Sequence, residues 1–165
     1  MKKLYFKEKF FKITDHYPIV DENGREVYYL DQNFTLVGYN SNVSDGNGKN
    51  LFSITREIFT LLPRYQVVFS KGTNMTVQKK FEFFRHRVDI FMSNGDNLYL
   101  DGDIWHLNFQ VINKEGALVG EVYKKFFSFA DNYELTIYDE NYDQELISLV
   151  LCLNNMVDLE RATSN

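Results

Sequence analysis

The feature that most constrains this fold is an apolar stretch near the C-terminus, at residues 144–159. Its first half, residues 146–153, is apolar except for Ser148, so a helix formed there would be apolar on every face. A helix without a polar face has to be enclosed by other parts of the protein. The sequence therefore predicts a helix that lies inside the molecule, surrounded by the residues that precede it.

The start of this stretch carries residue types that favour a helix N-terminus. Asn141 can cap the helix, and Gln144 follows three positions later, as in a capping box. Asp143 and Glu145 place negative charge in the first turn, where the helix dipole favours it. Polar residues enter in the second half, which is expected to emerge from the enclosure as an amphipathic segment. We predict a central helix over about residues 142–159.

The preceding residues read as short β-strands. Aromatic residues, which favour strands, make up 16% of the chain, and turn residues recur about every 8 to 12 positions, as in sandwiches and barrels. Residues 19–24 and 111–116 share one layout that ends in a glycine, which suggests two similar β halves. Residues 51–62 favour strand, although their spacing also allows a short helix. The expected strands are 4–13, 19–20, 26–30, 34–43, 51–62, 65–69, 75–84, 87–92, 98–100, 105–112, 118–129 and 133–138, with a turn at 101–103.

Length and charge narrow the class of protein. A chain of 165 residues with 44% hydrophobic residues is expected to form one domain, residues 1–165, with a real core. The net charge of −5 argues against nucleic acid as a partner. One cysteine, Cys152, rules out an internal disulfide framework, and no apolar run approaches the roughly 18 residues that span a bilayer. We expect a cytoplasmic protein without a cofactor, which meets a membrane only peripherally.

A pattern of apolar residues and turns is shared with a known family. The residues that carry it are Trp105, Phe109, the runs 111–116, 119–125 and 130–135, the helix end at 154–156, and the N-terminal runs 4–7 and 21–24. On these residues the chain resembles the LURP-one-related family, including its bacterial YxjI-type members. The likeness spans nearly the whole chain, and it includes no catalytic signature.

This resemblance implies a fold in more detail than the residues alone. The family is similar to the tubby C-terminal domain and to phospholipid scramblases. It implies a mainly β (α+β) fold, a closed antiparallel β-barrel of about twelve strands around a central hydrophobic C-terminal helix. Family members often carry aspartate where this chain has Asn154, so no role is assigned to that position.

A local cluster of basic residues is the candidate binding surface. Tubby-like domains bind phosphoinositides through basic residues on the side of the barrel, and the resemblance implies a similar place for this run. Anionic head groups attract such residues by about 1 kcal/mol each. The alternative is a solvated strand face that discourages edge pairing. The candidate lipid-binding residues are Lys71, Lys79, Lys80, Arg85 and Arg87.

An acidic segment before the helix is a weak calcium candidate. Asp139, Asn141 and Asp143 match the first, third and fifth positions of an EF-hand loop, and scramblase-like relatives have a proposed calcium segment near this place. However, Gln144 stands where the loop requires glycine, and Val150 stands where it requires glutamate. Helix capping explains these acids better, and no metal site is expected.

Enzyme motifs are mostly absent, so we predict a non-enzymatic binding domain. Its expected partner is an anionic membrane lipid or a protein, bound through a barrel-side surface. One alternative is a small-molecule carrier at the barrel mouth, which the helix disfavours because it fills the lumen. The other is an enzyme built on Asp101, Asp103 and His106, although a turn and a solvent-facing histidine explain these residues better.

Overall fold

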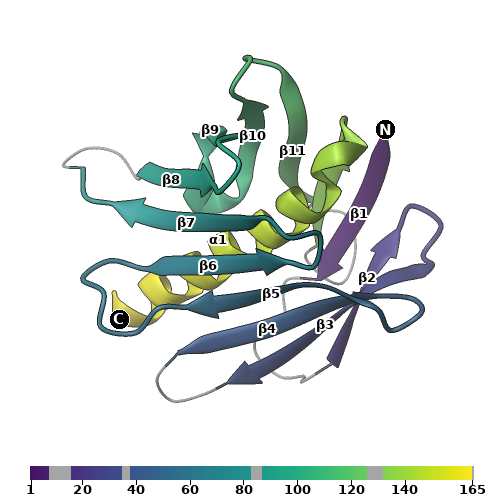
Figure 1. Cartoon of the computed structure of the whole chain (residues 1–165), viewed down its shortest axis with the longest axis horizontal. Coiled ribbons are helices and arrows are strands. Elements are labelled where there is room, and N and C mark those ends of the chain that lie inside the picture. The colour runs from purple at the N-terminus through teal and green to yellow at the C-terminus, as the bar shows by residue number, and fades with distance from the viewer. Residues whose placement is uncertain (8–15, 35–37, 83–86, 126–131, 165) are drawn as a thin grey trace.

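The computed structural model of the chain describes residues 1–7, 16–34, 38–82, 87–125 and 132–164. In these residues, twelve antiparallel strands close into a barrel, and one long helix runs through it (Figure 1). Each strand pairs with its neighbours in sequence, and β1 closes the barrel by pairing with β12. The strands are β1 Lys2–Lys7, β2 His16–Asp21, β3 Glu26–Phe34, β4 Tyr39–Asp45, β5 Asn50–Arg56, β6 Arg64–Phe69, β7 Asn74–Lys80, β8 Arg87–Met92, β9 Leu98–Asp103, β10 Asn108–Asn113, β11 Leu118–Lys125 and β12 Asn132–Ile137.

The helix α1, Asp143–Thr163, fills the inside of the barrel. Leu149, Leu151 and Cys152 have no solvent exposure, and they share one core with the inward-facing residues of the strands. Its 21 residues extend about 31 Å, enough to traverse a small barrel. The predicted closed barrel around a central hydrophobic helix is therefore confirmed. The helix ends later than the predicted residue 159, because no proline or glycine interrupts the last turn.

The start of the helix is held differently from the prediction. Tyr142 occupies the cap position without a capping side chain, so the predicted cap at Asn141 is wrong. Asp139 instead caps a short 3-10 turn, Glu140–Tyr142, by accepting a hydrogen bond from the Asn141 N–H at 3.0 Å. The acidic first turn of α1 is balanced by lysines of the barrel. Lys2 contacts Asp143 at 2.5 Å, and Lys71 pairs with the buried Glu145.

One end of the barrel, here the turn end, holds five tight turns at 22–25, 46–49, 70–73, 93–97 and 114–117. In each turn a glycine N–H donates to the carbonyl three residues earlier, with a positive φ that favours glycine. These glycines are Gly24, Gly48, Gly72, Gly95 and Gly116. The layout seen twice in the sequence therefore occurs in hairpins all around the wall, and it does not mark two halves.

The opposite end, here the loop end, is irregular. The loop 57–63 joins β5 to β6, the 3-10 turn Ile104–His106 joins β9 to β10, and α1 ends here. The alternative of a short helix within 51–62 is wrong, because β5 runs to Arg56 and the loop follows. The predicted strand over 105–112 is wrong in its first three residues, which form this 3-10 turn and its cap.

Two further expectations differ from the structure. The predicted strand 34–43 is two strands, since β3 ends at Phe34 and β4 begins at Tyr39. The predicted turn at 101–103 belongs to β9, which pairs with β10 as far as its last residue. Gly102 permits this pairing, because a Cβ at that position would lie 2.7 Å from the Asn108 carbonyl oxygen.

Candidate functional site

The loop 57–63 exposes an unusual amount of apolar surface at the loop end. Phe59 is 97% exposed and Leu61 is 99% exposed, while Ile58 is 47% exposed. Phe59 also has a φ of 64°, a left-handed conformation that costs a bulky residue about 1–2 kcal/mol. The loop closes on itself through the Thr60 hydroxyl, which donates to the Glu57 carbonyl at 3.4 Å. These exposed side chains contribute little to the core, so their position is a candidate contact surface.

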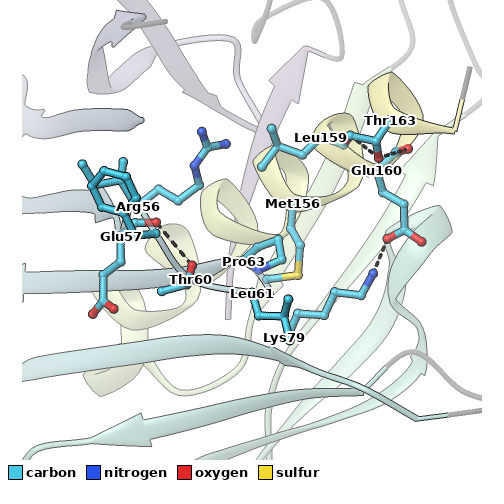
Figure 2. Close-up of a pocket in the computed structure, with 12 residues that line it drawn as sticks. Arg56, Glu57, Thr60, Leu61, Pro63, Lys79, Met156, Leu159, Glu160 and Thr163 are labelled. Atoms are coloured by element: carbon cyan, nitrogen blue, oxygen red, sulfur yellow. Dashed lines mark hydrogen bonds and ion pairs between the residues drawn. The ribbon is translucent and has the colours of Figure 1, made fainter. Parts of the chain in front are cut away.

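A groove of about 430 Å³ lies between this loop and the last turns of α1. Figure 2 shows Met156 and Leu159 of the helix on one side and Leu61 and Pro63 of the loop on the other. Lys79 reaches across the groove to Glu160, with its Nζ 2.6 Å from a carboxylate oxygen. The groove is therefore apolar in the middle, with an ion pair at its edge.

The charges around this groove are mostly balanced. The Lys79 ammonium also lies 4.7 Å from the centre of the Trp105 ring, which favours a cation over its face. On the loop side, the Arg64 Nε lies 3.5 Å from the Glu57 carboxylate. The lining residues include two cations, Arg56 and Lys79, and two acids, Glu57 and Glu160, so the groove has no net formal charge and presents no strong field of either sign.

The structure separates the predicted basic cluster. Lys71 lies in a turn at the turn end, whereas Lys79, Lys80 and Arg87 lie towards the loop end, on the paired strands β7 and β8. Arg85 lies outside the described residues. A barrel side with all five cations together is therefore not present in the described part of the chain.

Each described member of this cluster has an acidic neighbour. Arg87 contacts Asp89 at 2.8 Å and Glu82 at 3.3 Å, and Lys80 lies 3.9 Å from Asp89. Lys71 and Lys79 are held by carboxylates of α1, at opposite ends of the helix. These pairs lower the net positive charge that a head group would meet, and lipid binding by this run stays a prediction.

The calcium candidates have partners within the protein. Asp139 accepts hydrogen bonds from the backbone N–H of Asn141 and from its side-chain amide at 2.9 Å, while Asp143 pairs with Lys2. Within residues 1–7, 16–34, 38–82, 87–125 and 132–164, no three His, Cys, Asp or Glu side chains are grouped to hold a metal ion. In the structure these acids stabilise the start of the helix: Asp139 caps the preceding 3-10 turn, and Asp143 pairs with Lys2.

The residues of the enzyme alternative lie on the surface. Asp103 caps the 3-10 turn and contacts the His106 ring at 2.7 Å. Partial burial opposes ionisation of the Asp103 carboxyl, but hydrogen bonds from His106 outweigh it and lower the pKa. Asp101 lies two residues earlier on β9, and all three side chains are exposed. The arrangement is a hydrogen-bonded pair of Asp103 and His106 beside a turn.

Sequence reasoning missed the 57–63 loop. Its residues include Ile58, Phe59 and Leu61, which are apolar and favour strands, and it lacks the glycine and asparagine that mark turns. The available signal was Pro63, because proline cannot donate to a strand ladder and is found at strand starts. It indicated a break before β6, but it did not indicate that the preceding side chains point into solvent.

No helix in the described residues is both long and apolar enough to cross a membrane. The model of the LURP-one-related family matches residues 2–154. The chain is 33% identical over 142 residues to "Uncharacterized protein YxjI" of Bacillus subtilis, covering 86% of this chain and 85% of that protein. It is also similar to the X-ray structure of a protein from Arabidopsis thaliana, with a TM-score of 0.66 at 16% identity, covering 95% of this chain and 91% of the other.

Proposed function

Because this chain belongs to the LURP-one-related family, whose matched Bacillus relative is described as uncharacterized, we propose a function from the chain's own surface. The protein is a non-enzymatic binding domain that docks a partner protein through the loop end. The contact surface consists of the exposed loop 57–63 and the groove beside the last turns of α1.

The observation that carries this proposal is the state of Phe59. The residue is almost fully exposed, so it gains nothing from burial in the folded chain, and its left-handed backbone is strained. Strain of this kind is concentrated at functional sites. Burying a phenylalanine side chain against a partner would return about 1.5–3 kcal/mol. Binding to an apolar pocket of a partner would therefore offset the strain at Phe59.

Charge favours a protein partner over an anionic bilayer. The cations that line the groove, Arg56 and Lys79, are matched in number by Glu57 and Glu160, and the whole chain carries a net charge of −5. A negative membrane surface attracts clusters of unpaired cations. An apolar contact with a balanced rim is instead typical of protein interfaces.

Anionic lipid is the second candidate, and the position of the loop favours it. Phe59 and Leu61 are almost fully exposed and line the groove together with Arg56 and Lys79, so apolar insertion beside cations is geometrically available. The carrier alternative has less support. The inside of the barrel is occupied by the buried side chains of α1, and the groove described above lies at the surface.

Site-specific photo-crosslinking tests the protein-docking proposal. A benzophenone amino acid is placed at Leu61, and a matched one at Val68, which is 55% exposed on the barrel wall. Adducts formed in the cells that make the protein are identified by mass spectrometry, and each adduct partner is purified. The proposal expects a partner that crosslinks at position 61 and not at position 68.

Affinity measurements then separate docking from chance contact. The double variant Phe59→Ser and Leu61→Ser should bind that partner at least about tenfold more weakly, while Val68→Ser should bind it as well as the parent does. Equal binding by the double variant contradicts the proposal. A separate sedimentation assay uses phosphatidylglycerol vesicles. If the parent sediments with them but not with phosphatidylcholine vesicles, and the double variant sediments with neither, the loop binds a membrane and not a protein.

A further inference from the structure

The barrel wall is open between β8 and β9. These strands share one residue pair, Ile90 with Leu98, next to the turn that joins them. By contrast, β7 and β8 share six pairs, and β9 and β10 also share six. Continued pairing would place Val88 opposite Leu100 and Arg87 opposite Asp101, but these pairs do not form in the described residues, and residues of both strands line a cavity there. The wall therefore has an opening that is bounded by two strand edges.

The opening has a volume of about 600 Å³, within the range of ligand sites. Its inner side is apolar, with Val88, Ile90, Leu98 and Ile104 buried. Figure 1 shows β8 beside β7. An opening with an apolar floor and backbone on both sides resembles the place of a missing strand.

We propose that this opening accepts an extended peptide segment of a partner protein, which adds as a strand between β8 and β9. A strand edge presents N–H and C=O groups that pair with another extended chain. Beyond Leu98, the edge of β9 runs over residues 99–103, about 16 Å at the rise of a strand. The edge of β8 before Ile90 faces it from the other side. A segment of four to six residues therefore fits the length of the opening.

Acidic residues at the rim of the opening favour a peptide segment with basic side chains. Glu82, Asp89 and Asp101 line the opening, and Arg87, the one basic residue among the described residues that line it, is already paired with the first two. The Asp101 side chain makes no ion pair within the described part of the chain. Since strand residues alternate between faces, the guest places apolar side chains on the buried floor and basic side chains at the rim. This site is separate from the 57–63 loop and does not depend on it.

A designed peptide tests the proposal directly. The probe is an acetylated and amidated octapeptide of alternating lysine and valine, titrated into isotope-labelled protein and followed by NMR. Binding should be saturable, with shift changes concentrated in residues 87–91 and 98–103. The same peptide with N-methylated valines lacks half of its backbone donors and should bind at least about tenfold more weakly. A peptide of alternating glutamate and valine should not bind.

A matched pair of charge reversals checks the position. Asp101→Lys should weaken the lysine–valine peptide about tenfold or more, while Glu115→Lys, at an exposed turn-end position, should leave its affinity within about twofold. The spectra of both variants report whether each is folded. Three results would overturn the proposal: no binding, equal binding of the N-methylated peptide, or shift changes centred on the 57–63 loop. Dimerisation through residues 87–103 without any peptide would assign the opening to a second copy instead.

Discussion

Two seams of this barrel are built in opposite ways. The seam between β1 and β12 joins the first and last strands through six residue pairs. It is reinforced by Glu134 of β12, whose carboxylate contacts Lys3 of β1 at 2.7 Å and Lys125 of β11 at 2.6 Å. The seam between β8 and β9 joins consecutive strands through a single pair, and it opens towards the loop end.

The difference follows from how far apart the strands lie in the sequence. β1 and β12 meet only when the whole chain is ordered, so many contacts have to offset the entropy of closure. β8 and β9 are already held by the turn 93–97, where the Met92 N–H donates to the Asn97 side chain at 2.9 Å. A local seam can therefore remain open at little cost, which leaves its strand edges available to a peptide.

Hydrogen exchange should show the largest contrast. Amides of β1 and β12 are expected to exchange through global unfolding, with an opening free energy of about 5 kcal/mol or more. Amides of β8 and β9 that face the opening should exchange by local fluctuation, with values near zero. Native-state exchange followed by NMR measures both seams in one sample. Equal protection of the two seams would mean that the β8–β9 wall is closed in solution.

Truncation of a leucine in each seam should give the next largest difference. Leu4 of β1 is fully buried, and Leu4→Ala should lower the free energy of unfolding by about 3 kcal/mol. Leu100 of β9 is half-buried beside the opening, and Leu100→Ala should cost about 1 kcal/mol, because less packing is lost. Urea unfolding of the two variants provides the comparison. Similar losses at both positions would contradict the asymmetry.

The carboxylates of the two seams should differ in their pH dependence. Burial opposes ionisation of Glu134, but hydrogen bonds from Lys125 and Lys3 outweigh it and lower the pKa from about 4.5 to about 2. Glu134→Gln should therefore cost roughly 3 kcal/mol at neutral pH. Because the folded pKa lies below the unfolded one, this contribution is full above about pH 4.5 and decreases as the pH falls towards 2.

Urea unfolding of the parent and the Glu134→Gln variant between pH 7 and pH 3 measures this dependence. The two stabilities should converge in the acid range. The matched change at the open seam, Asp101→Asn, should stay within about 0.5 kcal/mol of the parent, because this side chain is exposed and makes no ion pair with a described residue. A Glu134→Gln deficit that is constant with pH would contradict the ionic origin of the effect.

The smallest expected effect lies outside both seams, in the 57–63 loop. Phe59→Gly should raise the free energy of unfolding by about 0.5–1 kcal/mol, because glycine adopts a φ of 64° without strain. Phe59→Ala retains the strained backbone and serves as the control, with a smaller change. Thermal and urea unfolding measure both variants. A loss of stability in the glycine variant would show that Phe59 supports the fold.

The architecture was predictable where a run of residues has a single hydrophobic pattern along its whole length. The run from Leu146 to Leu153 has no polar face, so its enclosure followed from composition, and the alternation in 87–92 matched β8 to the residue. Barrel closure came from the family resemblance, because the pairing of β1 with β12 leaves no local signal. The helix extended past residue 159 because Glu160, Arg161 and Ala162 are good helix formers.

The candidate surfaces were less predictable, because they depend on contacts between distant residues. The basic run looked like one cluster, but the strand β7 separates Lys71 from Lys79, and α1 supplies a carboxylate to each. The apolar loop looked like a strand, since exposure is not visible in residue type. The opening between β8 and β9 depends on how the two strands pair with each other, and the sequence of either strand alone does not specify this pairing.

The position of α1 after all twelve strands sets a condition on synthesis. A ribosome adds about 5–20 residues per second and releases the N-terminal parts first, so the strands emerge before the segment that fills them. Until residues 143–163 are synthesised, the inward faces of the twelve strands have no helix to pack against. The edge of β1 that pairs with β12 also stays unpaired until β12 is made. For most of translation the nascent strands therefore expose apolar side chains and unpaired strand edges, which favour aggregation. A premature stop before Asp143 would leave a chain that aggregates, and chaperone contact during synthesis is the expected safeguard.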